Sequence, residues 1–168
     1  MSVRAILGQQ VSVKGASTMT GRVAKEFGTP LIDADEARVI FPSAATLADA
    51  DLTTVGVTRQ RASSIRDLAT AVAAGQLRFD SAIEPEEFER AITAIKGVGI
   101  WTAQYIAMRL GEPDAFPATD LYLRRAGENS EAWRPWRAYA VLHLWTAEAG
   151  AAGPTVMRMS EHVCAIPV

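Results

Sequence analysis

Apolar side chains recur at helical spacing along almost the whole chain, and no alternating run of apolar and polar residues lies between hairpin turns. This pattern predicts an all-α fold. The expected helices cover residues 3–9, 13–27, 44–49, 59–75, 86–95, 100–110, 121–127 and 136–150, with one more short helix between Asp51 and Gly56.

Start and stop signals flank several of these helices. Ser43, Asp51 and Thr58 stand where a side-chain oxygen can cap a first turn, and Gly56 and Gly75 stand where helices commonly end. Two apolar stripes are expected to face the core: Ala62, Ile65, Ala69 and Val72 in one helix, and Ile100, Ala103, Ala107 and Leu110 in another.

The composition is that of an ordinary globular protein. Of 168 residues, 49% are hydrophobic and 21% are charged, which suits one compact domain or two small lobes with a shared core. The net charge of −2 counts mildly against a nucleic-acid partner, but the local field matters more to a ligand than the sum. Acidic residues crowd segments 33–51 and 80–89. The early and central basic residues are compatible with one positive face: Arg4, Lys14, Arg22, Lys25, Arg59, Arg61 and Arg66.

Few residues are available for covalent or metal chemistry. The single Cys164 rules out a disulfide within the chain and a site built from several thiolates, and His143 and His162 are the only imidazoles. A transition-metal site is therefore not expected. The chain shows no signal-peptide pattern and no apolar run of about 18 residues, so we expect no membrane partner and a cytoplasmic protein.

The segment AIKGVGIWTAQY, residues 94–105, places Gly97 and Gly99 between two predicted helices. Glycines let the backbone approach a ligand closely, and the first amides of the following helix form a natural phosphate site. Carbonyl groups that point the other way can hold a monovalent cation. On the Gly-Val-Gly tripeptide alone, a plain tight turn is the more frequent explanation.

The wider pattern is more specific. Apolar anchors at helix-hairpin-helix spacing surround the glycines, and the Gly/Pro-rich loop GEPDAFPATD with its aspartate follows. In these features the chain resembles the helix-hairpin-helix DNA glycosylase superfamily. It is most similar to the bacterial 3-methyladenine DNA glycosylase II branch, through VRAILGQQVSV, GVGIWTAQY, FPATDLYLRR and RPWRAYAVLHLW between residues 3 and 145. The resemblance implies one helical glycosylase domain over residues 1–168, with two lobes and an active site in the cleft between them.

Trp101 decides which reaction the resemblance implies. Superfamily members that also cut the DNA backbone have a catalytic lysine at this position, because an amine must form a Schiff base with the sugar. An indole cannot do so, and Lys96 lies five positions earlier in the hairpin. We therefore expect a monofunctional base-excision repair glycosylase that requires no cofactor for its chemistry.

Asp120 is the carboxylate that the resemblance selects for catalysis. Hydrolysis of an N-glycosidic bond develops positive charge on the sugar, which a nearby carboxylate stabilises while it orients water. An alkylated purine is already cationic and needs no second acid to leave. From its position alone, Asp120 is more readily explained as a helix cap, and Asp114 in the same loop as a turn residue.

Further site residues also follow from the resemblance. It places Trp101, Tyr105 and Trp145 around a flipped base, whereas the spacing alone slightly favours a buried helix. Trp133 and Trp136 are assigned to packing. Gln10 takes the position from which family members insert a side chain into the duplex, with an exposed polar turn as the equal alternative.

The resemblance also assigns roles in the hairpin. Lys96, Thr102 and the amides of Gly97 and Gly99 are expected to meet DNA phosphate. A structural sodium or potassium ion is expected on the backbone carbonyls of Thr93, Ile95 and Val98.

Members of this branch usually carry an N-terminal β-rich domain, which these residues do not encode. We therefore expect a shortened member or a fragment, with apolar surface exposed at Val3, Ile6 and Leu7. The expected partner is double-stranded DNA with alkylated bases, and the expected state is a monomer. Two alternatives remain: a non-catalytic helix-hairpin-helix DNA-binding module, and a helical interaction domain with a fortuitous hairpin.

Overall fold

The computed structural model describes residues 1–31, 38–79, 83–126 and 130–151. Its α-helices are α1 (Ser2–Leu7), α2 (Val13–Phe27), α3 (Ala44–Asp49), α4 (Arg59–Ala73), α5 (Pro85–Thr93), α6 (Ile100–Leu110), α7 (Leu121–Ala126) and α8 (Arg137–Ala151). Two short 3-10 helices are η1 (Leu52–Val55) and η2 (Ser130–Trp133). The predicted all-α class is confirmed. Within the described ranges, no helix is long and apolar enough to cross a membrane.

The predicted capping residues hold the helices that follow them. The Ser43 hydroxyl accepts a hydrogen bond from the Thr46 amide at the start of α3, and the Thr58 hydroxyl accepts one at the start of α4. Asp51 caps η1, which Gly56 ends with a φ of 87°. These boundaries agree with the sequence because each depends on contacts within a few residues.

One pair of strands was not predicted. β1 (Thr29–Leu31) pairs antiparallel with β2 (Arg38–Ile40), with Thr29 opposite Ile40. Each strand has only three residues, and all six are exposed. A strand this short and this exposed produces no alternation of buried and solvated positions, so the pattern could not reveal it.

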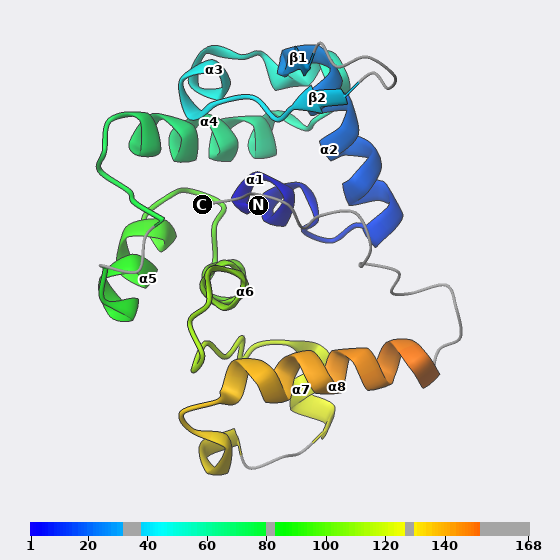
Figure 1. Cartoon of the computed structure of the whole chain (residues 1–168), viewed down its shortest axis with the longest axis vertical. Helices are drawn as coiled ribbons and strands as arrows, with labels where there is room; N and C mark the ends of the chain where they lie inside the picture. The colour runs from blue at the N-terminus through cyan, green and yellow to red at the C-terminus, as the bar shows by residue number, and fades with distance from the viewer. Residues whose placement is uncertain (32–37, 80–82, 127–129, 152–168) are drawn as a thin grey trace.

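Helix α6 lies at the centre of the molecule, with α1 above it and α7 and α8 below it in Figure 1. It packs against α5 and α1, and α1 in turn packs against α2 and α4. In the lower part of Figure 1, α7 packs against α8. The loop between α6 and α7 therefore joins two groups of helices, and α6 carries residues that can face both.

The buried core confirms one predicted stripe and half of another. Ala62, Ile65 and Ala69 of α4 are buried, and Val72 is half-buried. Of the predicted stripe in α6, Ala103 and Ala107 are buried, whereas Ile100 is 44% exposed. Ile100 and Leu110 are the first and last residues of α6 and are both exposed, so the predicted stripe was wrong at its two ends.

The predicted exposure of the first helix was also wrong. Val3, Ile6 and Leu7 are buried, with Leu7 0% exposed, because α1 is enclosed by α2, α4 and α6. Trp133 packs edge-on against Phe116, as a packing residue should, with ring centroids 6.4 Å apart. Trp136 does not fit that assignment, because 58% of it is exposed.

The Asp114 side chain joins the loop after α6 to the start of α8 and to Arg134, which follows η2. Its carboxylate accepts hydrogen bonds of 2.8 Å from Nε and Nη2 of Arg137 and pairs with Arg134. Asp114 stands in a turn, which confirms the prediction made for it. Burial acts to raise the pKa of Asp114, but the hydrogen bond and charge of Arg137, together with the charge of Arg134, hold it below its usual value.

Asp114→Asn should lower the melting temperature at pH 7 by about 3–6 °C, because hydrogen bonds to charged groups contribute about 1.5–3 kcal/mol before partial exposure reduces them. A lowered folded pKa gives stability that is present above the unfolded pKa of about 4 and is lost as pH falls through the folded value. The difference between variant and parent should therefore shrink below about pH 4. Thermal unfolding from pH 7 to pH 3 measures it. The control Glu131→Gln, at a side chain that is 65% exposed, should change less, and a difference independent of pH would contradict the assignment.

Candidate active site

Asp120 occupies the junction between the loop after α6 and the start of α7. Its Oδ1 accepts hydrogen bonds from the amides of Tyr122 and Leu123, at 3.0 and 3.1 Å. Its own amide donates to the Pro117 carbonyl at 2.8 Å. Asp120 therefore caps α7, as its position alone suggested, and these bonds fix the direction in which the carboxylate points.

The same carboxylate receives two indole N–H groups from other helices. Nε1 of Trp101 in α6 donates to Oδ2 at 3.0 Å, and Nε1 of Trp145 in α8 donates to Oδ1 at 3.4 Å. Capping uses only one oxygen, so it does not exclude a second role for this residue. Donors from three elements hold an anionic group in one orientation beside aromatic rings.

Three aromatic side chains form a cluster next to this carboxylate. The rings of Trp101 and Tyr105 are stacked, with centroids 5.4 Å apart and planes 5° apart. Trp145 is tilted against both, with centroids 6.3 and 6.2 Å away. All three are half-buried, so the alternative of a fully buried helix does not hold for this side of α6. Because Trp101 and Tyr105 already contact each other, a base can stack on the outside of the cluster but not between them.

The hairpin between α5 and α6 is built as its spacing predicted. Ile95 and Val98 are buried, and Gly97 has a φ of 88°, in the left-handed region that favours glycine. An added Cβ on Gly97 would lie 2.5 Å from the Ser64 hydroxyl of α4, which donates to the Lys96 carbonyl at 2.6 Å. The Lys96 side chain is exposed. Helix α4 thus supports the turn from inside, while the lysine faces outward.

A family model described as HhH-GPD superfamily base excision DNA repair protein matches residues 3–142. The chain belongs to this superfamily. The match runs from α1 into α8 and includes the hairpin and Asp120. It confirms the resemblance drawn from the four sequence motifs.

Curated relatives of this HhH-GPD chain are DNA repair proteins by name. The probable bifunctional transcriptional activator/DNA repair enzyme AlkA of Mycobacterium tuberculosis is 42% identical over 160 residues, which cover 86% of this chain and 32% of the relative. DNA-3-methyladenine glycosylase 2 of Escherichia coli is 36% identical over 159 residues, which cover 87% of this chain and 56% of the relative. The chain thus spans about one third and just over half of the lengths of these two relatives.

Solved structures of glycosylases share the fold. The 3-methyladenine DNA glycosylase of Schizosaccharomyces pombe, in complex with abasic DNA, superposes with a TM-score of 0.70 at 25% identity, over 88% of this chain and 78% of that one. A DNA-3-methyladenine glycosidase from Bacillus halodurans has a TM-score of 0.69 at 30% identity, over 89% of this chain and 75% of that one. The helical arrangement of the HhH-GPD chain is therefore that of glycosylases.

Thr102 differs from its predicted role within the HhH-GPD hairpin. It is 3% exposed, and its hydroxyl accepts a hydrogen bond of 3.1 Å from Gln9 Nε2. The hydroxyl is thus directed into the protein rather than toward a phosphate. The Thr102 amide lies in the first turn of α6, where amides have no partner within the helix, so the amide is the group left to meet an anion.

The monovalent cation stays a prediction for this HhH-GPD chain. Of the three expected carbonyl ligands, that of Ile95 accepts the Val98 amide at 3.0 Å, which leaves its second lone pair available. The carbonyls of Lys96 and Gly97 are taken by Ser64 and Gln9. Among the described residues, no group of His, Cys, Asp or Glu could hold a metal ion.

Gln10 is exposed and lies in the turn after α1 of this HhH-GPD chain, with a φ of 55°. That left-handed conformation is uncommon for a residue other than glycine. The sequence did not single out its neighbour Gln9, whose side chain reaches the hairpin 88 residues away. The only local signal was the Gln-Gln doublet, because the partners of Gln9 come from a distant part of the chain.

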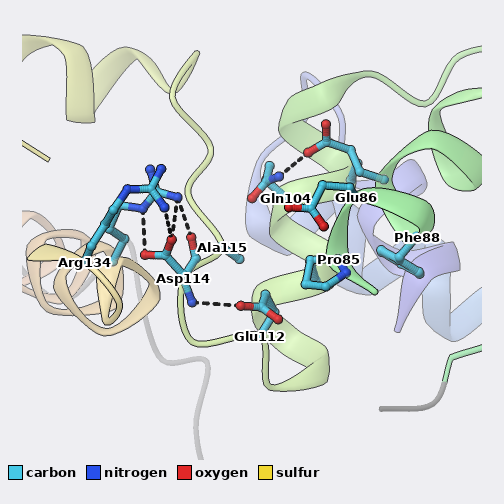
Figure 2. Close-up of a pocket in the computed structure, with 12 residues that line it drawn as sticks. Pro85, Glu86, Phe88, Gln104, Glu112, Asp114, Ala115 and Arg134 are labelled. Carbon is cyan, nitrogen blue, oxygen red and sulfur yellow. Dashed lines mark hydrogen bonds and ion pairs between the residues drawn. The ribbon is translucent and has the colours of Figure 1, made fainter. Parts of the chain in front are cut away.

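A pocket of about 250 Å³ lies between α5, α6 and the loop that follows α6 in the HhH-GPD chain (Figure 2). Its lining includes Glu86, Glu89 and Glu112, whose charges are unfavourable for DNA phosphate. Figure 2 shows Arg134 turned toward Asp114, so the arginine charge on this wall is already paired. Asp120 and the aromatic cluster do not line this pocket, which is therefore not the predicted base site.

Proposed function

We propose that this protein is a monofunctional DNA glycosylase that hydrolyses the N-glycosidic bond of alkylated purines, such as 3-methyladenine, in duplex DNA. The observation that carries the proposal is the Asp120 carboxylate, held by two indole N–H groups beside three aromatic rings. The names of the relatives and the glycosylase fold of the solved structures support it.

The arrangement suits a reaction that develops positive charge on a sugar. As the bond to the base breaks, the deoxyribose takes on oxocarbenium character, and the negative charge of Asp120 stabilises that state and orients the attacking water. A purine alkylated on a ring nitrogen is cationic, so it leaves without a general acid. The lesion is thus a good leaving group, and the protein has only to stabilise the sugar and position the water.

The aromatic cluster suits recognition of such a base. A cation over an aromatic face contributes about 0.5–2 kcal/mol, and base stacking about 1–3 kcal/mol. Extrusion of a base from the duplex costs a few kcal/mol, which these contacts offset in part. Contacts of this size favour a charged lesion without excluding a normal purine, so the weakness of the damaged bond adds to selectivity.

The hairpin suits a grip on one DNA strand. Its glycines allow close approach, the first amides of α6 present donors, and Lys96 adds an exposed positive charge. In this proposal, the backbone carbonyls of Thr93, Ile95 and Val98 would hold a monovalent cation, which would supply further positive charge beside the phosphate. We also assign the protein to the bacterial cytoplasm. We propose that it is a monomer, which size-exclusion chromatography tests.

The two hairpin glycines provide a matched pair of variants. Gly97→Ala should unfold at a lower temperature and bind DNA weakly, because φ is 88° and the new Cβ would meet Ser64 at 2.5 Å. An added Cβ on Gly99 meets nothing within 4 Å, so Gly99→Ala should change the melting temperature less. If a phosphate lies against this position, the added methyl group should still push it away from a backbone donor. DNA affinity should then fall about tenfold, which corresponds to the free energy of one hydrogen bond to a charged group. Fluorescence anisotropy with labelled duplex measures both, and an unchanged affinity for Gly99→Ala would place the phosphate elsewhere.

The decisive test is release of methylated purines from alkylated duplex DNA. The proposal predicts release of free base, together with no covalent adduct on abasic-site DNA in the presence of borohydride. Binding that weakens with salt but releases no base would instead identify a DNA-binding module. A trapped adduct would overturn the monofunctional assignment, and absence of DNA binding would identify a helical interaction domain.

A further inference from the structure

Gln9 connects the turn after α1 to the hairpin between α5 and α6. Its side-chain Nε2 donates to the Gly97 carbonyl at 2.9 Å and to the Thr102 hydroxyl at 3.1 Å. One amide thus contacts both the turn of the hairpin and the first turn of α6. Gln9 is half-buried, so part of this connection is shielded from water.

Arg61 binds the backbone of Gln9, whereas the hairpin binds its side chain. Its guanidinium, in the first turn of α4, donates to the backbone carbonyl of Gln9. This carbonyl belongs to the peptide group that leads into Gln10, the residue with a φ of 55°. The peptide before Gln10 is therefore attached to α4, while the side chain of Gln9 is attached to the hairpin.

These contacts compensate for an unfavourable backbone. A non-glycine residue in the left-handed region would relax to a commoner conformation if the surrounding bonds were absent. Gln10 is exposed, so its own side chain is not held by core packing. Within the turn, the Val11 amide donates to the Gly8 carbonyl at 3.4 Å. The bonds of Gln9 and Arg61 are the contacts that tie this turn to the hairpin and to α4.

We infer that Gln9 and Arg61 are positioning residues that hold Gln10 in register with the hairpin, so that a protein gripping phosphate through the hairpin presents the Gln10 side chain to the base stack. The inference rests on the proposed function. It makes base extrusion, rather than binding or bond cleavage, the step that depends on Gln9. A pre-ordered turn avoids the entropy cost of ordering Gln10 during insertion.

Gln9→Met is the informative variant, because methionine keeps the length of the side chain but cannot donate a hydrogen bond. Two duplexes carry the same alkylated purine, one fully paired and one with the lesion in a single-nucleotide bulge that costs little to extrude. Gln9→Met should slow single-turnover release about tenfold on the paired duplex and less than threefold on the bulge, with DNA affinity within about twofold of the parent. Gln10→Ala should show the same pattern.

Two further comparisons separate positioning from a general structural role. The double variant Gln9→Met with Gln10→Ala should be no slower than Gln10→Ala alone, because Gln9 acts through Gln10. Arg61→Met should reproduce the loss, and Arg61→Lys, which retains a donor, should restore most of the rate. Equal losses on both duplexes, or additive losses in the double variant, would overturn the inference.

Base extrusion is also measured without chemistry, by the fluorescence of 2-aminopurine placed beside the lesion. Gln9→Met should give a much smaller rise than the parent at equal saturation with DNA. If the parent extrudes the base and Gln9→Met does not, but the parent releases no base, the proposed function fails while the inference stands. If Gln9→Met extrudes the base as well as the parent, the inference fails whatever the release assay shows.

Discussion

Asp120→Asn is expected to slow release of alkylated purines by on the order of 10²–10³-fold, the range found when one electrostatic stabiliser of a transition state is removed. The variant separates the two roles of this residue. Asparagine is as good a helix cap as aspartate, and its carbonyl can still accept from the amides of Tyr122 and Leu123. What it loses is the negative charge opposite the developing oxocarbenium ion, so the fold should persist without the activity.

Single-turnover rates on alkylated duplex, with DNA affinity and melting temperature measured in parallel, test this expectation. The matched control is Asp114→Asn in the same loop, assayed well below its melting temperature, which should retain activity within about threefold because its carboxylate is used by Arg137 and Arg134. An Asp120→Asn protein as active as the parent would refute the mechanism. Equal losses in both variants would point to damage to the loop rather than to catalysis.

Trp101→Ala is expected to lower kcat/KM by about 10–100-fold, because it removes a stacking surface of about 1–3 kcal/mol. It also removes the 3.0 Å hydrogen bond to Asp120 Oδ2. Trp101→Phe distinguishes these contributions, since phenylalanine keeps a ring against Tyr105 but has no N–H donor. Its activity should lie between those of the parent and the alanine variant.

Steady-state and single-turnover kinetics on the same duplex separate binding of the extruded base from chemistry in these variants. The control is Trp133→Phe, which packs against Phe116 and should alter stability alone. If Trp101→Phe were as slow as Trp101→Ala, the hydrogen bond to Asp120 would outweigh stacking. If neither variant differed from the parent, the aromatic cluster would not be the base site.

The helix boundaries that the sequence predicted correctly are set by contacts between near neighbours along the chain. The caps Ser43 and Thr58 and the terminating Gly56 marked helix boundaries correctly, because capping bonds join residues only two or three positions apart. The same locality limited the prediction. The six strand residues of β1 and β2 are too few and too exposed to leave a pattern, and Trp136 has no local signal that separates an exposed indole from a packed one.

By itself, the sequence determined the helical class and the superfamily, because motif order and spacing carry that information. It also predicted a site at Trp101, Tyr105, Asp120 and Trp145, four residues that the structure brings together. Only the tertiary structure decided that Trp101 and Trp145 both donate to Asp120, that Thr102 is turned inward, and that α1 is buried. The tertiary structure alone also showed the hydrogen bonds from Gln9 to Gly97 and Thr102. These contacts join residues 19 to 93 positions apart, and such pairs meet only after the helices between them have packed.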